Sequence, residues 1–139
     1  ALRADCTRRR VGAVAFDTSG RVIGTGRNGA PPGYPGCLTA GACPRGRKST
    51  QEVKPGAPYE AGGHCIAVHA EANCCLYSDP IARRGGLMAI TDAPCDGCST
   101  LIAGSGLARA IWADKDEGGR WVIYERLLGY PHPVGGHYA

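Results

Sequence analysis

Four residues in two short motifs are the ones best suited to chemistry: His69, Glu71, Cys95 and Cys98. The histidine and the two cysteines offer one imidazole nitrogen and two thiolate sulfurs, a ligand set that suits zinc. Three protein ligands leave the fourth tetrahedral position open to water, whose pKa the metal lowers toward neutrality. The ligand set therefore predicts a catalytic zinc centre held by His69, Cys95 and Cys98.

Glu71 is predicted to carry a proton rather than to bind the metal. Forming hydroxide from water needs a proton acceptor, and expelling ammonia from a ring needs a proton donor. A carboxylate two residues from the histidine ligand can serve both steps. The order His-x-Glu followed by Pro-Cys-x-x-Cys is the signature of zinc-dependent nucleobase deaminases.

Each half of this pattern has a plainer interpretation. A Cys-x-x-Cys pair is often a structural zinc ligand pair or a redox motif, and a single histidine on a helix often belongs to the core or the surface. The two halves in the right order, with a buried-strand pattern between them, favour catalysis. A non-catalytic zinc module would have no use for Glu71, so we treat it as the weaker alternative.

The elements that position these residues follow from the hydrophobic pattern. Residues 11–16 and 21–27 are short apolar runs around a turn at 17–20 and predict a β-hairpin. Residues 64–77 lack a helix breaker and predict a helix carrying His69 and Glu71. Residues 87–91 and 109–113 predict buried strands, and residues 94–103 a helix opened by proline. Residues 121–128 are predicted to form a last helix.

This order predicts an α/β fold, a three-layer α/β/α sandwich with helices on both faces of a central mixed sheet. We expect a single domain over residues 1–139, in which residues 1–5 are the end of a helix that begins upstream. Residues 28–63 are rich in glycine and proline without sustained periodicity and predict a long loop. A loop of 36 residues is uncommon in a compact domain, so it should be functional, cross-linked or pinned by metal.

The sequence resembles the cytidine deaminase superfamily and, more narrowly, the deoxycytidylate (dCMP) deaminase family. Four segments carry the resemblance: Arg10-Val-Gly-Ala-Val14, Gly24-Thr-Gly-Arg-Asn-Gly-Ala-Pro31, Cys65-Ile-Ala-Val-His-Ala-Glu-Ala-Asn73 and Ala93-Pro-Cys-Asp-Gly-Cys98. The resemblance implies a cytidine deaminase-like fold, hydrolytic deamination of dCMP to dUMP, and a homo-oligomer. It also implies that Asn28 contacts the nucleotide and that the main chain of Ala70 holds the base.

Two positions depart from the family pattern. Arg27 stands where an aromatic residue is common, and Asp96-Gly97 stand inside the Cys-x-x-Cys where proline or methionine is frequent. Arg27 is predicted either to reach a substrate phosphate or to be solvated. The departures leave other substrates open: a free nucleoside, a modified cytosine nucleotide, another small ring compound, or a base in nucleic acid.

The remaining cysteines suggest a second metal site. Cys6, Cys37, Cys43 and Cys65 could close a tetrahedral zinc site that orders the long loop, and His64 could replace one of them. Some phage members of the resembled family have a second zinc that ties this loop to the core. The alternative is that the four are free thiols. Cys74 and Cys75 are expected to pack as buried thiols.

The amino-acid composition argues against several other classes of protein. The chain has 139 residues, of which 20% are charged and 43% hydrophobic, and no apolar run approaches the roughly 18 residues of a membrane helix. Nine aromatic residues give little support for a nucleic-acid groove. Six of the eight cysteines fall into candidate metal-ligand groups rather than a disulfide scaffold, which favours a reduced cytoplasmic metalloenzyme without a membrane partner.

Overall fold

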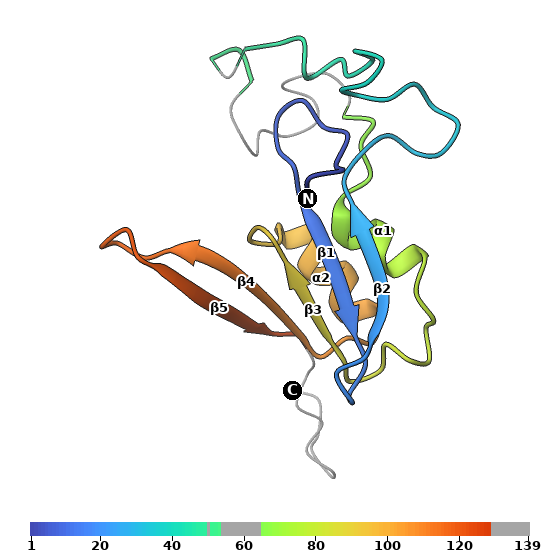
Figure 1. The fold of residues 1–139 in the computed structure, drawn as a ribbon, viewed down its shortest axis with the longest axis vertical. Helices are drawn as coiled ribbons and strands as arrows, with labels where there is room; N and C mark the ends of the chain where they lie inside the picture. Colours follow the sequence, from blue (N-terminus) through green and yellow to red (C-terminus); the bar gives the residue numbers. More distant parts are fainter. Residues whose placement is uncertain (50, 54–64, 129–139) are drawn as a thin grey trace, which may run out of the picture.

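The computed structural model describes residues 1–49, 51–53 and 65–128 as a mixed five-stranded sheet with two helices (Figure 1). The strands are β1 (Gly12–Phe16), β2 (Val22–Arg27), β3 (Leu87–Ile90), β4 (Arg109–Lys115) and β5 (Trp121–Leu127), in the spatial order β2-β1-β3-β4-β5. The helices are α1 (Ala70–Leu76) and α2 (Asp96–Gly104). The predicted α/β class with a mixed sheet is confirmed.

The predicted first hairpin is confirmed, with β1 and β2 antiparallel. The Asp17 carboxylate accepts hydrogen bonds from the Ser19 hydroxyl and from the backbone N–H groups of Arg21 and Ser19, and these bonds, the hydroxyl's most of all, lower its pKa. Gly20 has φ +82°, a conformation that an L side chain rarely adopts. The turn chemistry that predicted the hairpin is therefore the chemistry that closes it.

The middle of the sheet sets up the region of the predicted metal ligands. β3 and β4 are parallel, and α2 makes the connection between them. β1 runs antiparallel to β3 on the other side. The segment with Cys95 and Cys98 therefore leaves the carboxyl end of β3, where loops of α/β sheets commonly carry binding residues.

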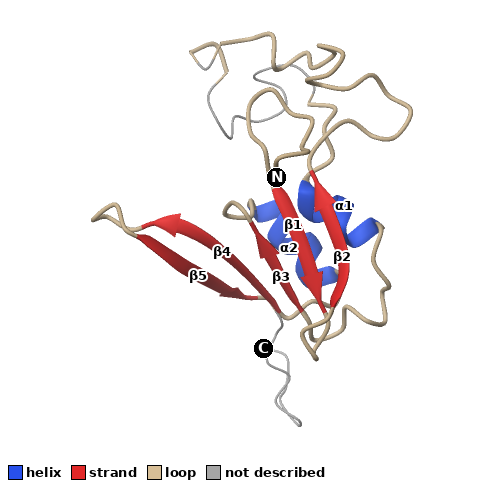
Figure 2. Ribbon diagram, in the orientation of Figure 1, coloured by secondary structure: helices blue, strands red, loops and turns tan. Residues whose placement is uncertain are grey.

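Both helices pack against each other and on the same face of the sheet (Figure 2). The core between helices and sheet is made of small and medium side chains, among them Ala13, Ala15, Met88 and Ile102. Cys74 and Cys75 belong to this core, as predicted, and burial raises the pKa of the Cys74 thiol to about 11. Gly26 lets β2 approach α1 closely, because a Cβ there would lie 2.0 Å from the Ala70 carbonyl oxygen.

The predicted helix at residues 121–128 is wrong, because Trp121–Leu127 form β5, which pairs antiparallel with β4. Its tryptophan, valine, isoleucine and tyrosine prefer strands, and the Asp116 carboxylate accepts from the N–H groups of Gly118 and Arg120 to close a hairpin turn. Within the described residues, no helix therefore covers the second face of the sheet, which the three-layer expectation required.

Two further boundaries differ from the expectations. The helix expected over residues 64–77 begins only at Ala70, because Val68 pairs with Gly29 in a β-bridge and His69 is still extended. Residues 1–5 form a turn closed by an Ala4 N–H bond to the Ala1 carbonyl, not the end of a helix. The long loop is confirmed within residues 30–49 and 51–53, which contain no helix or strand. No helix among the described residues is long and apolar enough to cross a membrane.

Candidate metal centre

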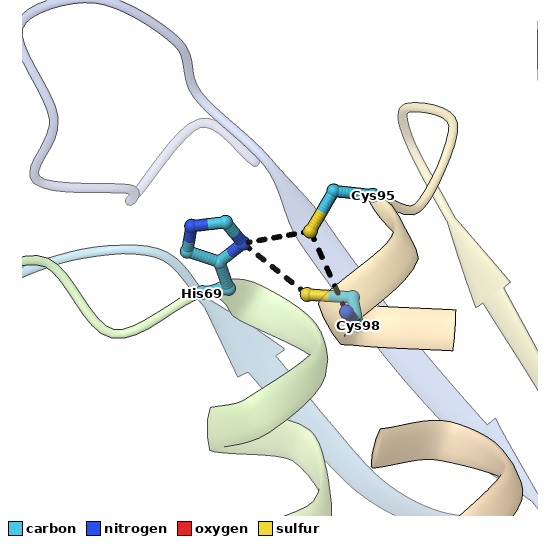
Figure 3. Close-up of side chains that lie close together, drawn as sticks. All are labelled: His69, Cys95 and Cys98. Carbon is cyan, nitrogen blue, oxygen red and sulfur yellow. Dashed lines mark hydrogen bonds between the residues drawn. The ribbon is translucent and has the colours of Figure 1, made fainter. Parts of the chain in front are cut away.

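The structure brings His69, Cys95 and Cys98 together at the amino-terminal ends of α1 and α2 (Figure 3). The His69 Nδ1 atom lies 3.2 Å from the Cys98 Sγ atom and 3.9 Å from the Cys95 Sγ atom. His69 and Cys95 are exposed, while Cys98 is buried. The ligand group is thus buried at Cys98 and open to solvent at His69 and Cys95, so water or substrate can reach it, as a catalytic zinc site requires.

The spacing of these donor atoms fits zinc. Tetrahedral zinc with Zn–S of about 2.3 Å and Zn–N of about 2.0–2.1 Å places a ligand nitrogen and sulfur ~3.5 Å apart. The two observed nitrogen–sulfur distances, 3.2 and 3.9 Å, lie on either side of that value. A zinc ion can therefore bind with only small side-chain adjustments.

The local backbone explains how the ligands reach this position. His69 is the N-cap residue of α1, and Cys95 is the N-cap residue of α2, whose sulfur accepts the Cys98 N–H at 3.4 Å. Helix amino termini carry partial positive charge and free N–H groups, which favour thiolate over thiol. Because the amino termini of α1 and α2 lie side by side, both stabilise thiolate at the ligand group.

Glu71 lies in the first turn of α1 and is only 4% exposed. Its carboxylate lies close enough to the Cys98 thiol to act on it electrostatically. Burial first, and then the charge of Glu71, raise the pKa of Cys98 above its ordinary range. A bound zinc ion has the opposite effect, because a coordinated thiol is deprotonated. Glu71 therefore stands beside the metal ligands without belonging to their group.

Asn28 and Ala70 are both buried near the start of α1. The Asn28 amide accepts the Val11 N–H at 2.9 Å and donates to the Arg9 carbonyl at 2.8 Å. Its side chain thus holds the segment that enters β1, a role that the sequence did not predict. Ala70 is the first residue of α1, so its N–H is among the donors that a helix start leaves without an intrahelical partner.

Arg27 lies away from the ligand group. Its guanidinium donates to the Arg3 carbonyl, and it lines a cavity of about 930 Å³ together with Arg3, Arg10 and Tyr77. Neither His69, Cys95 nor Cys98 lines this cavity. The contact of Arg27 with the substrate stays a prediction.

Cys6, Cys43 and Cys65 neighbour the buried thiol of Cys37. Burial, followed by the neighbouring thiols of Cys43, Cys6 and Cys65, raises the pKa of Cys37 to about 11. We call these four residues the thiol cluster. Their sulfur atoms lie less tightly together than the donors of His69, Cys95 and Cys98, the one group within the described residues whose ligand atoms all lie within 4.8 Å. His64 is outside the described residues.

Arg83 contacts both helices that carry the ligand group, at the ends away from the ligands, and no sequence motif indicated it. It lies in the segment between α1 and β3, and its guanidinium contacts the carboxyl ends of both helices. The sequence showed only that Ser78-Asp-Pro80 ends a helix. A lone arginine in a connecting segment gives no signal of its partners, because these are backbone carbonyls.

Comparison with known proteins decides the family. The family model described as the cytidine and deoxycytidylate deaminase zinc-binding region matches residues 1–114. The chain belongs to this deaminase family. A deoxycytidylate deaminase of Mycobacterium phage D29 is 45% identical over 113 residues, 81% of this deaminase and 84% of the phage protein. A deoxycytidylate deaminase of Saccharomyces cerevisiae is 31% identical, but the match covers only 34% of the yeast protein.

Solved structures agree with the fold. The dCMP deaminase of cyanophage S-TIM5 in its apo form has a TM-score of 0.54 and 22% identity, over 84% of this deaminase and 75% of the other chain. The same cyanophage enzyme in complex with dCMP and dUMP has a TM-score of 0.52 and 25% identity, over 76% and 66% of the two chains. The deaminase therefore shares the cytidine deaminase-like fold.

Proposed function

We propose that this zinc-dependent deaminase hydrolyses dCMP to dUMP and ammonia. The observation that carries the proposal is the grouping of His69, Cys95 and Cys98 beside the buried carboxylate of Glu71. The choice of dCMP is supported by the phage D29 relative, which bears the name deoxycytidylate deaminase, and by the cyanophage enzyme solved with dCMP and dUMP.

The reaction requires protons to be moved at defined atoms. A C4–O bond forms with water, the C4–N4 bond breaks, and the two protons of water finish on ring nitrogen N3 and on the departing ammonia. Zinc, when bound, supplies a Lewis acid that lowers the pKa of water. The Glu71 carboxylate accepts the first proton, delivers it to N3 and then serves the leaving amine. Its burial keeps this carrier out of exchange with bulk solvent.

The substrate contacts belong to the same proposal. The helix-start N–H of Ala70 can bond the base, and Asn28 retains one amide hydrogen beyond its bond to the Arg9 carbonyl. Arg27 would reach a phosphate only if the nucleotide extended toward the arginine-lined cavity. These assignments rest on position and family resemblance.

The deciding experiment combines a substrate panel with one isosteric variant. Loss of ultraviolet absorbance is followed for dCMP, CMP, deoxycytidine, dCTP and 5-methyl-dCMP, using zinc-replete protein. We expect dCMP to be the best substrate and Glu71→Gln to lower kcat by roughly 10²–10⁴-fold while zinc stays bound. Glu117→Gln, in the exposed β4–β5 turn, is the matched control. Absence of turnover on every compound, or full activity of Glu71→Gln, would refute the proposal.

We also propose that the thiol cluster binds a second, structural zinc. Four thiolates satisfy a closed tetrahedral zinc site. The Gly46 N–H donates to the Cys43 sulfur at 3.1 Å, a bond that stabilises a ligating thiolate.

The surroundings of the thiol cluster support a cross-linking role. Asp5 accepts the N–H groups of Leu38 and Thr39, and Arg8 donates to the Val53 carbonyl at 2.6 Å. The segment around Cys6 is therefore already attached to the long loop. A metal at this point would tie that segment, the loop and the segment before α1 into one unit.

Elemental analysis tests the second zinc. We expect two zinc ions per chain in the wild-type protein, one in Cys43→Ser and two in Cys75→Ser, which removes a core thiol outside both ligand groups. His69→Ala should lose the catalytic zinc and keep the other. One zinc per chain in fully active wild-type protein would overturn the second site.

We further propose that the chain is a single domain that acts as a homo-oligomer in the cytoplasm. Leu76, Tyr77 and Ile81 are 71%, 67% and 72% exposed, an apolar patch that subunit contact would cover. Light scattering of the purified protein tests the oligomer, and cell fractionation tests the compartment. A monomer at assay concentration would contradict the homo-oligomer, and recovery outside the cytoplasm would contradict the proposed compartment.

A further inference from the structure

Arg83 joins the carboxyl-terminal ends of α1 and α2. Its Nη1 atom donates to the carbonyls of Cys75 and Ser78, the latter at 2.8 Å, and to the Ser78 hydroxyl at 2.9 Å. Its Nε atom donates to the carbonyl of Ser105, the C-cap residue of α2, at 3.2 Å. One half-buried guanidinium therefore satisfies carbonyls at the ends of two different helices.

The position is also electrostatically favourable. Neither α1 nor α2 has a basic residue in its last turn. The helices lie with like ends together, so the partial negative charges of their carboxyl ends are neighbours. The positive charge of Arg83 offsets this repulsion at one end, while thiolates at the other end suit the paired amino termini.

The opposite ends of the same helices hold the metal ligands. His69 caps α1, and Cys95 caps α2. With seven and nine residues, the helices are only about 10 and 14 Å long. A change in their relative tilt or translation at the Arg83 end therefore moves the His69 nitrogen relative to the two sulfur atoms.

We infer that Arg83 is a positioning residue for the metal centre: it fixes α1 against α2 so that His69 meets Cys95 and Cys98 in zinc-binding geometry. The inference rests on the assignment of these three residues as zinc ligands. It does not depend on which nucleotide the enzyme deaminates. Arg83 acts through the helices and touches neither metal nor substrate.

The test compares Arg83→Met with Arg84→Met. Arg84 is the exposed neighbour, and its substitution removes the same charge without removing the guanidinium hydrogen bonds that Arg83 makes to the helix ends. Zinc affinity is measured by competition with a chromophoric chelator, and ligand geometry by the visible absorption spectrum of the Co²⁺-loaded protein. We expect Arg83→Met to weaken zinc binding roughly 10- to 100-fold and to shift the Co²⁺ bands. Arg84→Met should match wild type in both.

A purely structural role predicts a different result. In that case Arg83→Met lowers the melting temperature but leaves the zinc affinity and the Co²⁺ spectrum unchanged, which would overturn the inference. If Arg83→Met does not fold, Arg83→Lys decides, because one compact ammonium group cannot span both helix ends as the guanidinium does. A Lys variant with wild-type zinc affinity and Co²⁺ spectrum would equally overturn it.

The readouts separate this inference from the proposed reaction. Both zinc competition and the Co²⁺ spectrum are recorded without substrate. If the protein proves inactive on dCMP yet Arg83→Met alters both signals, the positioning role stands and only the substrate assignment fails. If dCMP is deaminated and both signals are unchanged in Arg83→Met, the substrate assignment stands and the positioning role of Arg83 fails.

Discussion

Asn28 anchors the chain where it enters β1, because both ends of its buried amide bond the backbone of residues 9–11. Asn28→Ala leaves the Val11 N–H and the Arg9 carbonyl without these partners. The two lost hydrogen bonds are only partly buried and are each worth about 0.5–1.5 kcal/mol, so we expect a loss of about 1–3 kcal/mol in the free energy of unfolding. Urea denaturation of the zinc-saturated protein measures this loss.

The same variant separates the two roles of Asn28. A purely substrate-binding side chain would raise KM for dCMP and leave stability unchanged, which would contradict the anchoring role. Asn28→Asp is the matched control, because it keeps the acceptor for Val11 and loses the donor to Arg9. Its stability should fall between those of wild type and the alanine variant.

Gly26 determines how closely α1 approaches the sheet at the level of whole elements. A Cβ at this position would lie 2.0 Å from the Ala70 oxygen and 2.5 Å from the Cys74 nitrogen, both backbone atoms of α1. Gly26→Ala must therefore push the helix outward. We expect a destabilisation of about 1–3 kcal/mol and weaker zinc binding, since His69 caps this helix. Thermal unfolding and zinc competition measure the two effects.

Gly104→Ala serves as the control for Gly26→Ala. Gly104 ends α2, and a Cβ there meets nothing within 4 Å. The substitution should be neutral or stabilise by up to about 1 kcal/mol, because alanine loses less backbone entropy in a helix. Wild-type stability and zinc affinity in Gly26→Ala would show that α1 can shift without consequence.

The elements that could be predicted were those with local signals. The turn at Asp17 and Gly20 fixed the first hairpin, and Pro94 indicated the start of α2. The later start of α1 depends on the bridge between Val68 and Gly29, a pairing across 39 positions that periodicity does not contain. β5 did carry a local signal, the Asp116–Gly119 turn, which favours a hairpin with β4 over the predicted helix.

The site was predictable because ligand chemistry restricts residue types and spacing. His69, Cys95 and Cys98 stand out in the sequence, and the fold places them at two adjacent helix starts. Arg83 was not predictable, because its partners are backbone carbonyls brought together only in three dimensions. The gathering of Cys6 with cysteines more than 30 positions away likewise becomes visible only at the scale of the whole molecule.

Zinc should stabilise the whole molecule, because only the folded chain holds His69, Cys95 and Cys98 together. A ligand that binds the folded state alone, at 100 times its Kd, adds about 2.7 kcal/mol, which corresponds to a rise in Tm of about 10 °C for a domain of this size. Binding of zinc to cysteines of the unfolded chain would reduce this rise. Calorimetry of apo protein titrated with zinc measures it.

Variants of the two ligand groups show how much of the zinc-dependent rise in Tm comes from each metal site. Glu71→Gln should keep the full zinc-dependent rise in Tm, because Glu71 is not among the metal ligands. His69→Ala should lose the part due to the catalytic site, and Cys43→Ser the part due to the thiol cluster. The double variant should then melt at a temperature independent of zinc. A Tm that zinc does not change in the wild-type protein would mean that neither ligand group is coupled to folding, since linkage requires any ligand bound only by the folded state to raise it.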